Sequence, residues 1–136
     1  MTKIKTQERS LAAIPQPAII KICLPGAVVP KARARVTRNG TYFPQRYQNW
    51  RKMAESSILV SLSLIQRVTL PIHRAEVRIM LQGKHRGDLD NLAGSCLDAL
   101  VSSGVLLDDR LSCVPHLVIS HKPEGSSGVW LEVIPM

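Results

Sequence analysis

Apolar residues recur with two different periods along this chain, and that change of period constrains its fold more than any other feature. Between Gln45 and Gln66 they return every three or four residues, which predicts an amphipathic helix. Between Arg74 and Gln82 they alternate with polar residues, which predicts a half-buried strand. A second helix is predicted near Asp90–Ser102, where Gly104 is well placed to terminate it.

Three more segments have the composition of strands. They are Ala18–Leu24, Cys113–His121 and Gly128–Ile134, and a Pro-Glu-Gly-Ser-Ser-Gly turn between the last two predicts a hairpin. Asn39-Gly40 before Thr-Tyr-Phe predicts a tight turn into a short extended piece. The order strand, helix, strand, helix, strand, strand predicts an α/β (α+β) domain with a small mixed β-sheet and two main helices.

The 136 residues fit one domain with a buried core. We expect residues 1–17, which are polar and then contain two prolines, to be a flexible leader before a single domain over residues 18–136. The longest apolar runs are too short to span a bilayer, so no membrane partner is expected. Cys23, Cys96 and Cys113 fall in apolar stretches, and we expect reduced core thiols in a cytoplasmic protein.

The charge is large and unevenly distributed. Eighteen Lys and Arg against ten Asp and Glu give a net charge of +8, which indicates nucleic acid as the first candidate partner and an acidic membrane surface as the second. A well-solvated basic surface is the alternative. No acidic residue occurs from Pro25 to Ala54, where we expect the basic residues to grip DNA phosphates: Lys31, Arg33, Arg35, Arg38, Arg46, Arg51 and Lys52.

The acidic residues gather later in the chain. Asp88 and Asp90 are two apart at a strand-to-helix junction, where extended backbone points both side chains to one side. The amino terminus of a helix also favours a carboxylate. After the helix the chain turns back through Gly104 and delivers Asp108 and Asp109. If that return segment lies beside the first one, three carboxylates meet at one point.

Three neighbouring carboxylates repel one another unless a cation neutralises them. Oxygen ligands select Mg²⁺, for which Mn²⁺ can substitute. Such an ion polarises a phosphodiester and lowers the pKa of an attacking water. The pattern therefore indicates metal-assisted phosphodiester hydrolysis. The alternatives are that Asp90 only caps a helix and that Asp108 and Asp109 form a solvated turn.

Other polar residues are expected to be structural. Asp98 lies on the same helical face as Asp90, two turns on, and is expected to join a hydrogen-bond network or to face solvent. His85, His116 and His121 have no metal-ligand spacing, and we expect them at the surface or in strands.

Three spaced motifs occur together in the second half of the chain, and they are Gly87-Asp-Leu-Asp-Asn91, Leu97-Asp-Ala-Leu100 and Gly104-Val-Leu-Leu-Asp-Asp109. Together they resemble the signature of RusA-type Holliday-junction resolvases. The similarity extends back to Pro30-Lys-Ala-Arg-Ala-Arg35 and Asn39-Gly-Thr-Tyr-Phe-Pro44. The resemblance implies a Mg²⁺-dependent homodimer that makes paired symmetric nicks in four-way DNA junctions, in recombination and repair.

The resemblance also assigns roles by position. The essential carboxylates of the family match Asp88, Asp90 and Asp109, and all three are expected to hold the metal. Asp108 matches the acid before the last of them, and Asn91 matches a polar residue beside the metal site.

One position departs from the family pattern. Gly94 stands where family members usually carry a catalytic lysine, which would stabilise charge developing on the scissile phosphate. Either Lys84 or Arg86 supplies the cation from the loop before Asp88, with Lys84 preferred, or the partner subunit does, or the chain cuts slowly or not at all.

The rival functions are a non-catalytic junction-binding protein and an RNA-binding module. Gly94 weakens the helix by about 1 kcal/mol relative to alanine, which indicates close approach of DNA or the partner subunit, with genetic drift as the alternative.

Overall fold

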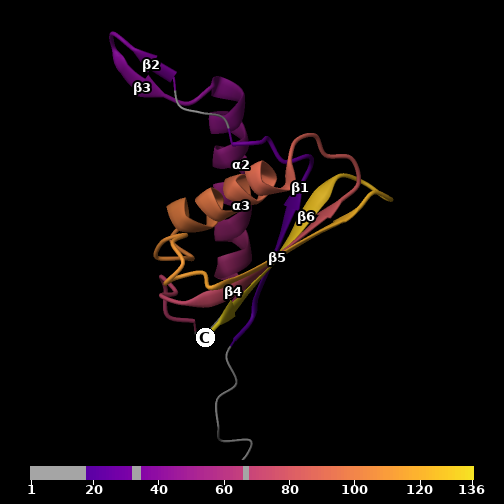
Figure 1. Ribbon diagram of the computed structural model, residues 1–136. Coiled ribbons are helices and arrows are strands. Elements are labelled where there is room, and N and C mark those ends of the chain that lie inside the picture. Colours follow the sequence, from indigo (N-terminus) through magenta and orange to yellow (C-terminus); the bar gives the residue numbers. More distant parts are fainter. Residues whose placement is uncertain (1–17, 32–34, 66–67) are drawn as a thin grey trace, which may run out of the picture.

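A computed structural model describes residues 18–31, 35–65 and 68–136 of the chain, and Figure 1 shows its elements. The expected leader, residues 1–17, lies outside the described residues. The secondary-structure elements confirm the predicted mixed sheet with two main helices. In chain order the elements are β1 (Ile20–Pro25), β2 (Arg35–Thr37), β3 (Gly40–Tyr42), α2 (Gln45–Ser63), β4 (Ala75–Gln82), α3 (Leu89–Ser102), β5 (His116–Lys122) and β6 (Gly128–Pro135).

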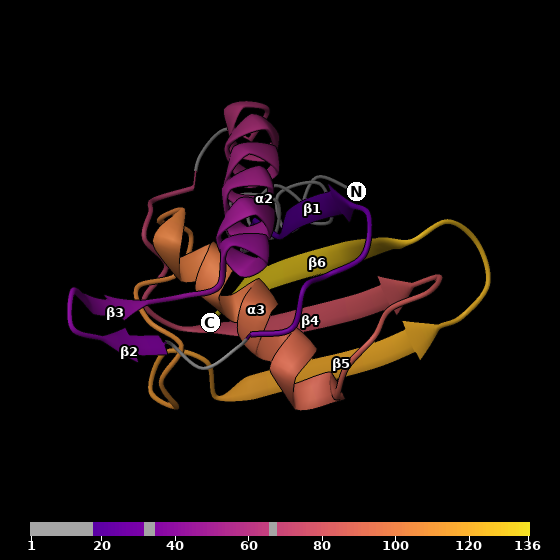
Figure 2. The same cartoon turned by 90° about the horizontal axis from the view of Figure 1, so that it is seen from above.

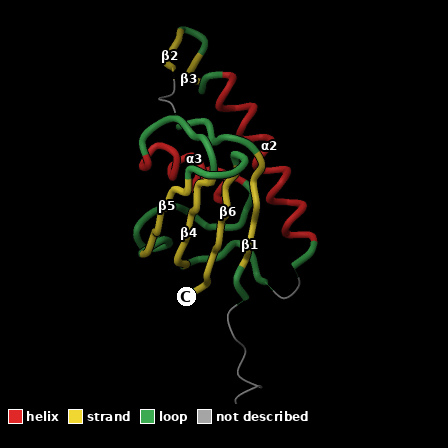
Figure 3. The backbone as a smooth tube through the Cα atoms, turned by 90° about the vertical axis from the view of Figure 1, so that its right-hand side faces the viewer, coloured by secondary structure: helices red, strands yellow, loops and turns green. Residues whose placement is uncertain are grey.

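The main sheet has the strand order β1-β6-β4-β5, which can be followed in Figure 3. Strand β6 is antiparallel to both β1 and β4, whereas β5 is parallel to β4. The predicted hairpin between the last two strands is therefore wrong, because β4 lies between them. Val129, Leu131 and Val133 of β6 are buried, so β6 takes a central place, and the mostly exposed β5 takes the edge.

The core lies between one face of the sheet and the two helices. Strand residues alternate between buried and exposed or partly exposed positions, as expected when helices cover one face only. From the sheet the core receives Ile20, Ile22, Leu24, Ala75, Val77, Ile79, Leu81, Val129, Leu131 and Val133. From the helices it receives Tyr47, Trp50, Ala54, Ile58, Leu92, Ala93, Cys96, Leu97, Ala99 and Leu100.

The other face of the sheet has exposed apolar side chains. Trp130 is 49% exposed and Val118 is 50% exposed, and Cys23 also lies on this face, which we call the open face. The expectation of three core thiols is therefore wrong for Cys23, because strand alternation turns it away from the helices. Cys96 and Cys113 are buried as predicted, and burial raises the pKa of the Cys96 thiol to about 12. No helix in the described ranges has the length and hydropathy needed to cross a membrane.

Strands β2 and β3 form a separate hairpin. It is the predicted Asn39-Gly40 turn, in which Gly40 has a φ of 119°, a conformation that favours glycine. The hairpin projects beyond the first turn of α2 and away from the main sheet (Figure 1). Val36 in it is 82% exposed, and Arg38 at its turn is exposed as well. Basic residues are thus displayed on an arm outside the core.

Candidate active site

Two carboxylates lie at the amino terminus of α3. Asp88 occupies the N-cap position in extended backbone, yet its side chain makes no capping hydrogen bond. Asp90 lies in the first turn of the helix. Both residues are exposed, and neither carboxylate has an ion pair with another described residue. The positive end of the helix dipole favours both negative charges. These two side chains therefore stay available for an external cation.

The third predicted carboxylate lies at the other end of α3. The helix has 14 residues and so separates its ends by about 21 Å. After it, the Leu107 N–H donates to the Ile72 carbonyl at 3.0 Å, and the Ile72 N–H donates to the Val105 carbonyl at 2.8 Å. These bonds hold the segment that leads to Asp109 at the start of β4, far from the loop that follows β4 (Figure 2).

The expectation that one chain brings Asp88, Asp90 and Asp109 to a single point is therefore wrong. No group of three or more His, Cys, Asp or Glu that could hold a metal occurs in residues 18–31, 35–65 and 68–136. The physical reason is that the return segment pairs with Ile72 instead of running back along the helix. One chain places Asp88 and Asp90 at the start of α3, where Asp90 is already in helical and not extended backbone, and it places Asp109 apart from them.

Asp108 is engaged within its own turn. Its carboxylate accepts the Asp109 N–H at 2.7 Å and an Arg110 guanidinium N–H at 3.0 Å. The backbone N–H of Asp109 is the main cause that lowers the pKa of the Asp108 carboxyl, and Arg110 lowers it further. Asp108 therefore fits the turn that was the alternative for this pair, while the side chain of Asp109 is exposed.

A segment from the loop after β1, Val28–Lys31, crosses the beginning of α3, and we call it the strap. The Ser95 hydroxyl donates to the Val29 carbonyl at 2.6 Å. The Lys31 N–H donates to the Asn91 carbonyl at 3.4 Å. These two hydrogen bonds fix the strap against the helix that holds the two free carboxylates.

His85 connects the strap to the sheet, and nothing in its sequence spacing revealed this. Its Nδ1 lies 3.2 Å from the Val28 nitrogen, and because a backbone N–H can only donate, Nδ1 must accept. Nε2 then has the proton, and it lies 2.9 Å from the Gln82 carbonyl and 3.1 Å from the Gly128 carbonyl. A second histidine, His121, is 2.7 Å from the Gly83 carbonyl through its Nε2. The loop before Asp88 is thus held by imidazole side chains.

We expect His85→Ala to lower the free energy of unfolding by about 2 kcal/mol, because part-buried backbone groups lose their partner. Hydrogen exchange of the Val28 amide should become faster as well. The matched control is His73→Ala, since His73 is exposed and has no hydrogen bond among the described residues. Equal exchange of Val28 in wild type and His85→Ala would contradict this role for the imidazole.

Three cations line a pocket beside the loop. Arg46 comes from the first turn of α2, whereas Lys84 and Arg86 come from the loop before Asp88, and together they border a cavity of about 480 Å³, the basic pocket. Guanidinium and ammonium groups at one cavity form a suitable site for phosphate oxygens. The rest of its lining is Ala27, Val28, Pro30, His85, Gly87 and Ser127.

The other predicted DNA-binding residues differ in availability. Arg38 and Lys52 are exposed. Arg51 is half-buried, and its Nε lies 3.2 Å from Glu55 and 3.3 Å from Ser102, so this side chain links α2 to α3. Arg33 lies outside the described residues, as does the side chain of Arg35.

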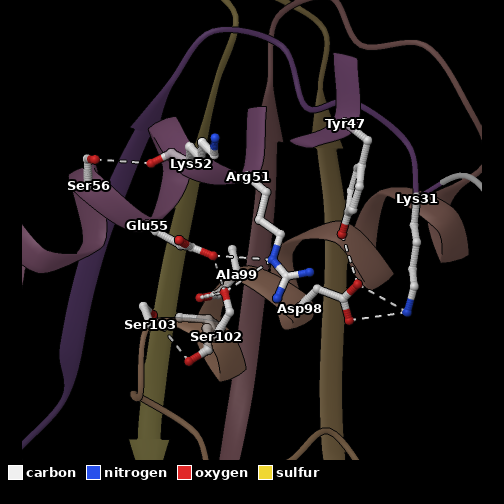
Figure 4. A network of polar contacts seen from close by, with 11 residues as sticks. Lys31, Tyr47, Arg51, Lys52, Glu55, Ser56, Asp98, Ala99, Ser102 and Ser103 are labelled. Carbon is white, nitrogen blue, oxygen red and sulfur yellow. Dashed lines mark hydrogen bonds and ion pairs between the residues drawn. The ribbon is translucent and has the colours of Figure 1, made fainter. Parts of the chain in front are cut away.

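A polar network connects the strap to both helices (Figure 4). The Tyr47 hydroxyl donates to Asp98 at 2.8 Å, and the Lys31 ammonium lies 3.1 Å from the same carboxylate. Burial, followed by the hydrogen bond to Asp98, raises the pKa of Tyr47 well above its ordinary value, so it remains a donor. The expected hydrogen-bond role of Asp98 is confirmed. Its spacing of eight residues from Asp90 was the only sequence signal for this place.

A comparison with protein families decides the class of the molecule. The model of the endodeoxyribonuclease RusA family matches residues 25–134, which is most of the chain. The chain belongs to the RusA family. Membership makes this RusA chain a DNA-binding endonuclease of the type that resolves Holliday junctions in recombination, and it confirms the resemblance drawn from the three motifs. A comparison with curated proteins found no match.

Proposed function

We propose that this RusA chain is a Mg²⁺-dependent endonuclease that resolves four-way DNA junctions by paired symmetric nicks. The observation that supports it most is the pair of free carboxylates at the start of α3, beside a pocket lined by three cations. The acids suit a metal ion and the pocket suits the phosphates that flank the cut. Such a combination serves hydrolysis of a polyanion better than binding alone.

The side chains at the start of α3 fit magnesium by their chemistry. Asp88 and Asp90 offer only carboxylate oxygens, the donors that Mg²⁺ and Mn²⁺ prefer. A bound ion would polarise the scissile phosphodiester and neutralise charge on it. The overall reaction consumes one water, breaks the bond between phosphorus and the 3′ oxygen, and leaves a 5′-phosphate and a 3′-hydroxyl.

A second copy of the chain would complete the site. Within one chain Asp109 is exposed and distant from Asp90, so we propose that Asp109 of the partner subunit joins Asp88 and Asp90. The surface through which the two chains associate would then have to include the start of α3 and the loop that carries Asp109, because both belong to the shared site. Two-fold symmetry would then give two sites for two opposed strands of the junction.

The basic residues would hold the arms of the junction. The hairpin that carries Arg38 stands away from the core, and the basic pocket lies beside Asp88, so phosphates can be held at two separate places. Contacts of this kind position DNA without reading its sequence. Each phosphate neutralised should steepen the log–log salt dependence of binding by about 0.9.

The test is cleavage of an end-labelled synthetic four-way junction at matched salt, with linear duplex and single-stranded RNA as competitors. We expect symmetric paired nicks with Mg²⁺ or Mn²⁺, none with EDTA, and weak competition by either competitor. Tight junction binding without any nick would show a non-catalytic binder. Preferential binding of the RNA would show an RNA-binding module, and either result would overturn the proposal.

A further inference from the structure

Lys31 passes directly over Gly94 of α3. A Cβ atom built on Gly94 would lie 3.7 Å from Lys31 Cδ and 4.0 Å from Lys31 Cβ, which is ordinary van der Waals distance. The segment that lies over this glycine is thus a lysine of the same chain, where the sequence had indicated DNA or the partner subunit. Its backbone is held there by the bond from the Lys31 N–H to the Asn91 carbonyl.

The side chain of Lys31 crosses α3 midway between two acidic residues. Asp90, Gly94 and Asp98 are spaced by four residues, so they lie on one helical face with successive Cα atoms about 6 Å apart along the axis. A lysine stem centred on Gly94 lies about one helical turn from either acid, and its flexible four-carbon chain can turn toward the start of α3. Because Gly94 has no side chain, nothing on the helix at that position blocks the swing.

In the structure the ammonium group lies at the Asp98 end of this row (Figure 4). It is 3.1 Å and 3.2 Å from the two carboxylate oxygens of Asp98, and the Lys31 side chain is 41% exposed. The Asp98 side chain is only 16% exposed, but its carboxylate keeps the hydrogen bond from Tyr47 when the exposed ammonium leaves. The Tyr47 hydroxyl also donates to Asp98 Oδ2 at 2.8 Å and keeps the acceptor in place.

We propose that Lys31 is a catalytic residue of this nuclease, whose ammonium turns from Asp98 toward Asp90 and donates hydrogen bonds to a non-bridging oxygen of the scissile phosphate. Charge that builds on that oxygen during hydrolysis is then stabilised by a cation from the strap. Asp98 is a positioning residue that holds the ammonium before DNA binds. This inference rests on the proposed function. It assigns the missing catalytic cation to Lys31 and not to Lys84, which lines the basic pocket with Arg46.

The test compares single-turnover cleavage of a four-way junction at saturating enzyme. Lys31→Ala should cut about 10²-fold more slowly, the usual loss when one such donor is removed, and Lys31→Gln should do the same. Junction affinity should fall less than about tenfold, because one phosphate contact is lost. Adding Gly94→Lys to Lys31→Ala should restore most of the rate, because it returns an ammonium to the same place on α3.

The matched control adds Ser102→Lys to Lys31→Ala, which returns the charge two helical turns farther along α3. That variant should stay slow. In a separate readout without DNA, Mn²⁺ binding followed by electron paramagnetic resonance should be unchanged or tighter in Lys31→Ala, because a nearby cation is removed.

Several outcomes would overturn the inference. Wild-type rates in Lys31→Ala would do so, as would equal rescue by Ser102→Lys. So would a loss in Asp98→Asn as large as that in Lys31→Ala, since it would reduce Lys31 to an ion-pair partner. If wild type and Lys31→Ala are both fully active, only the catalytic role of Lys31 is rejected. If the wild type is inactive, the proposed function is rejected and the role of Lys31 with it.

Discussion

Asp90→Asn is expected to slow single-turnover cleavage of a four-way junction by about 10³-fold or more. Asparagine keeps the size of the side chain but removes the negative charge that would hold Mg²⁺, and the charge stabilisation by such an ion is worth several kcal/mol in the transition state. Junction affinity should remain close to that of the wild type or increase, because one negative charge near the phosphates is gone. Rate and affinity are measured on the same labelled junction.

The control for this variant is Glu55→Gln, which removes a carboxylate that pairs with Arg51 between the two helices. It should lose some stability and keep its cleavage rate. Loss of Mn²⁺ binding in Asp90→Asn, detected without DNA, would link the defect to the metal. Near-normal cleavage by Asp90→Asn would mean that this carboxylate only stabilises the start of α3.

Mixed dimers are expected to regain activity that both parents lack. A dimer of one Asp90→Asn subunit and one Asp109→Asn subunit keeps one complete site if each site takes Asp88 and Asp90 from one chain and Asp109 from the other. It should therefore nick one strand of the junction, without the paired second nick. If each site took all three carboxylates from one chain, both sites would be defective and no strand would be cut.

The mixed dimers are obtained by co-expressing the two variants with different tags and purifying through both. The control pairs Asp88→Asn with Asp90→Asn, which leaves both sites damaged under either arrangement and should stay inactive. If the mixed dimer of Asp90→Asn and Asp109→Asn makes no nick, in material shown to contain both subunits, the shared site is rejected. A purely monomeric wild type would reject it as well.

The sequence by itself predicted the secondary structure and the class of molecule well. The spacing of apolar residues depends on local backbone geometry. The start of the helix at Gln45 and the end of the strand at Gln82 were therefore predicted correctly. The spaced motifs around Asp88, Asp90 and Asp109 predicted the family that the comparison confirms. The roles of these carboxylates stay predictions for the experiments above.

Only the tertiary structure decided which segments meet. Strand order depends on which faces are buried, so β6 took the centre of the sheet, and a turn sequence could not exclude the hairpin. The position of Asp109 depends on backbone pairing of Val105 and Leu107 with Ile72, a residue far from Asp109 in sequence. The approach of Lys31 to Gly94 needs a loop and a helix folded together. Local patterns determine elements, whereas long-range packing determines a site, because only packing brings distant side chains to one place.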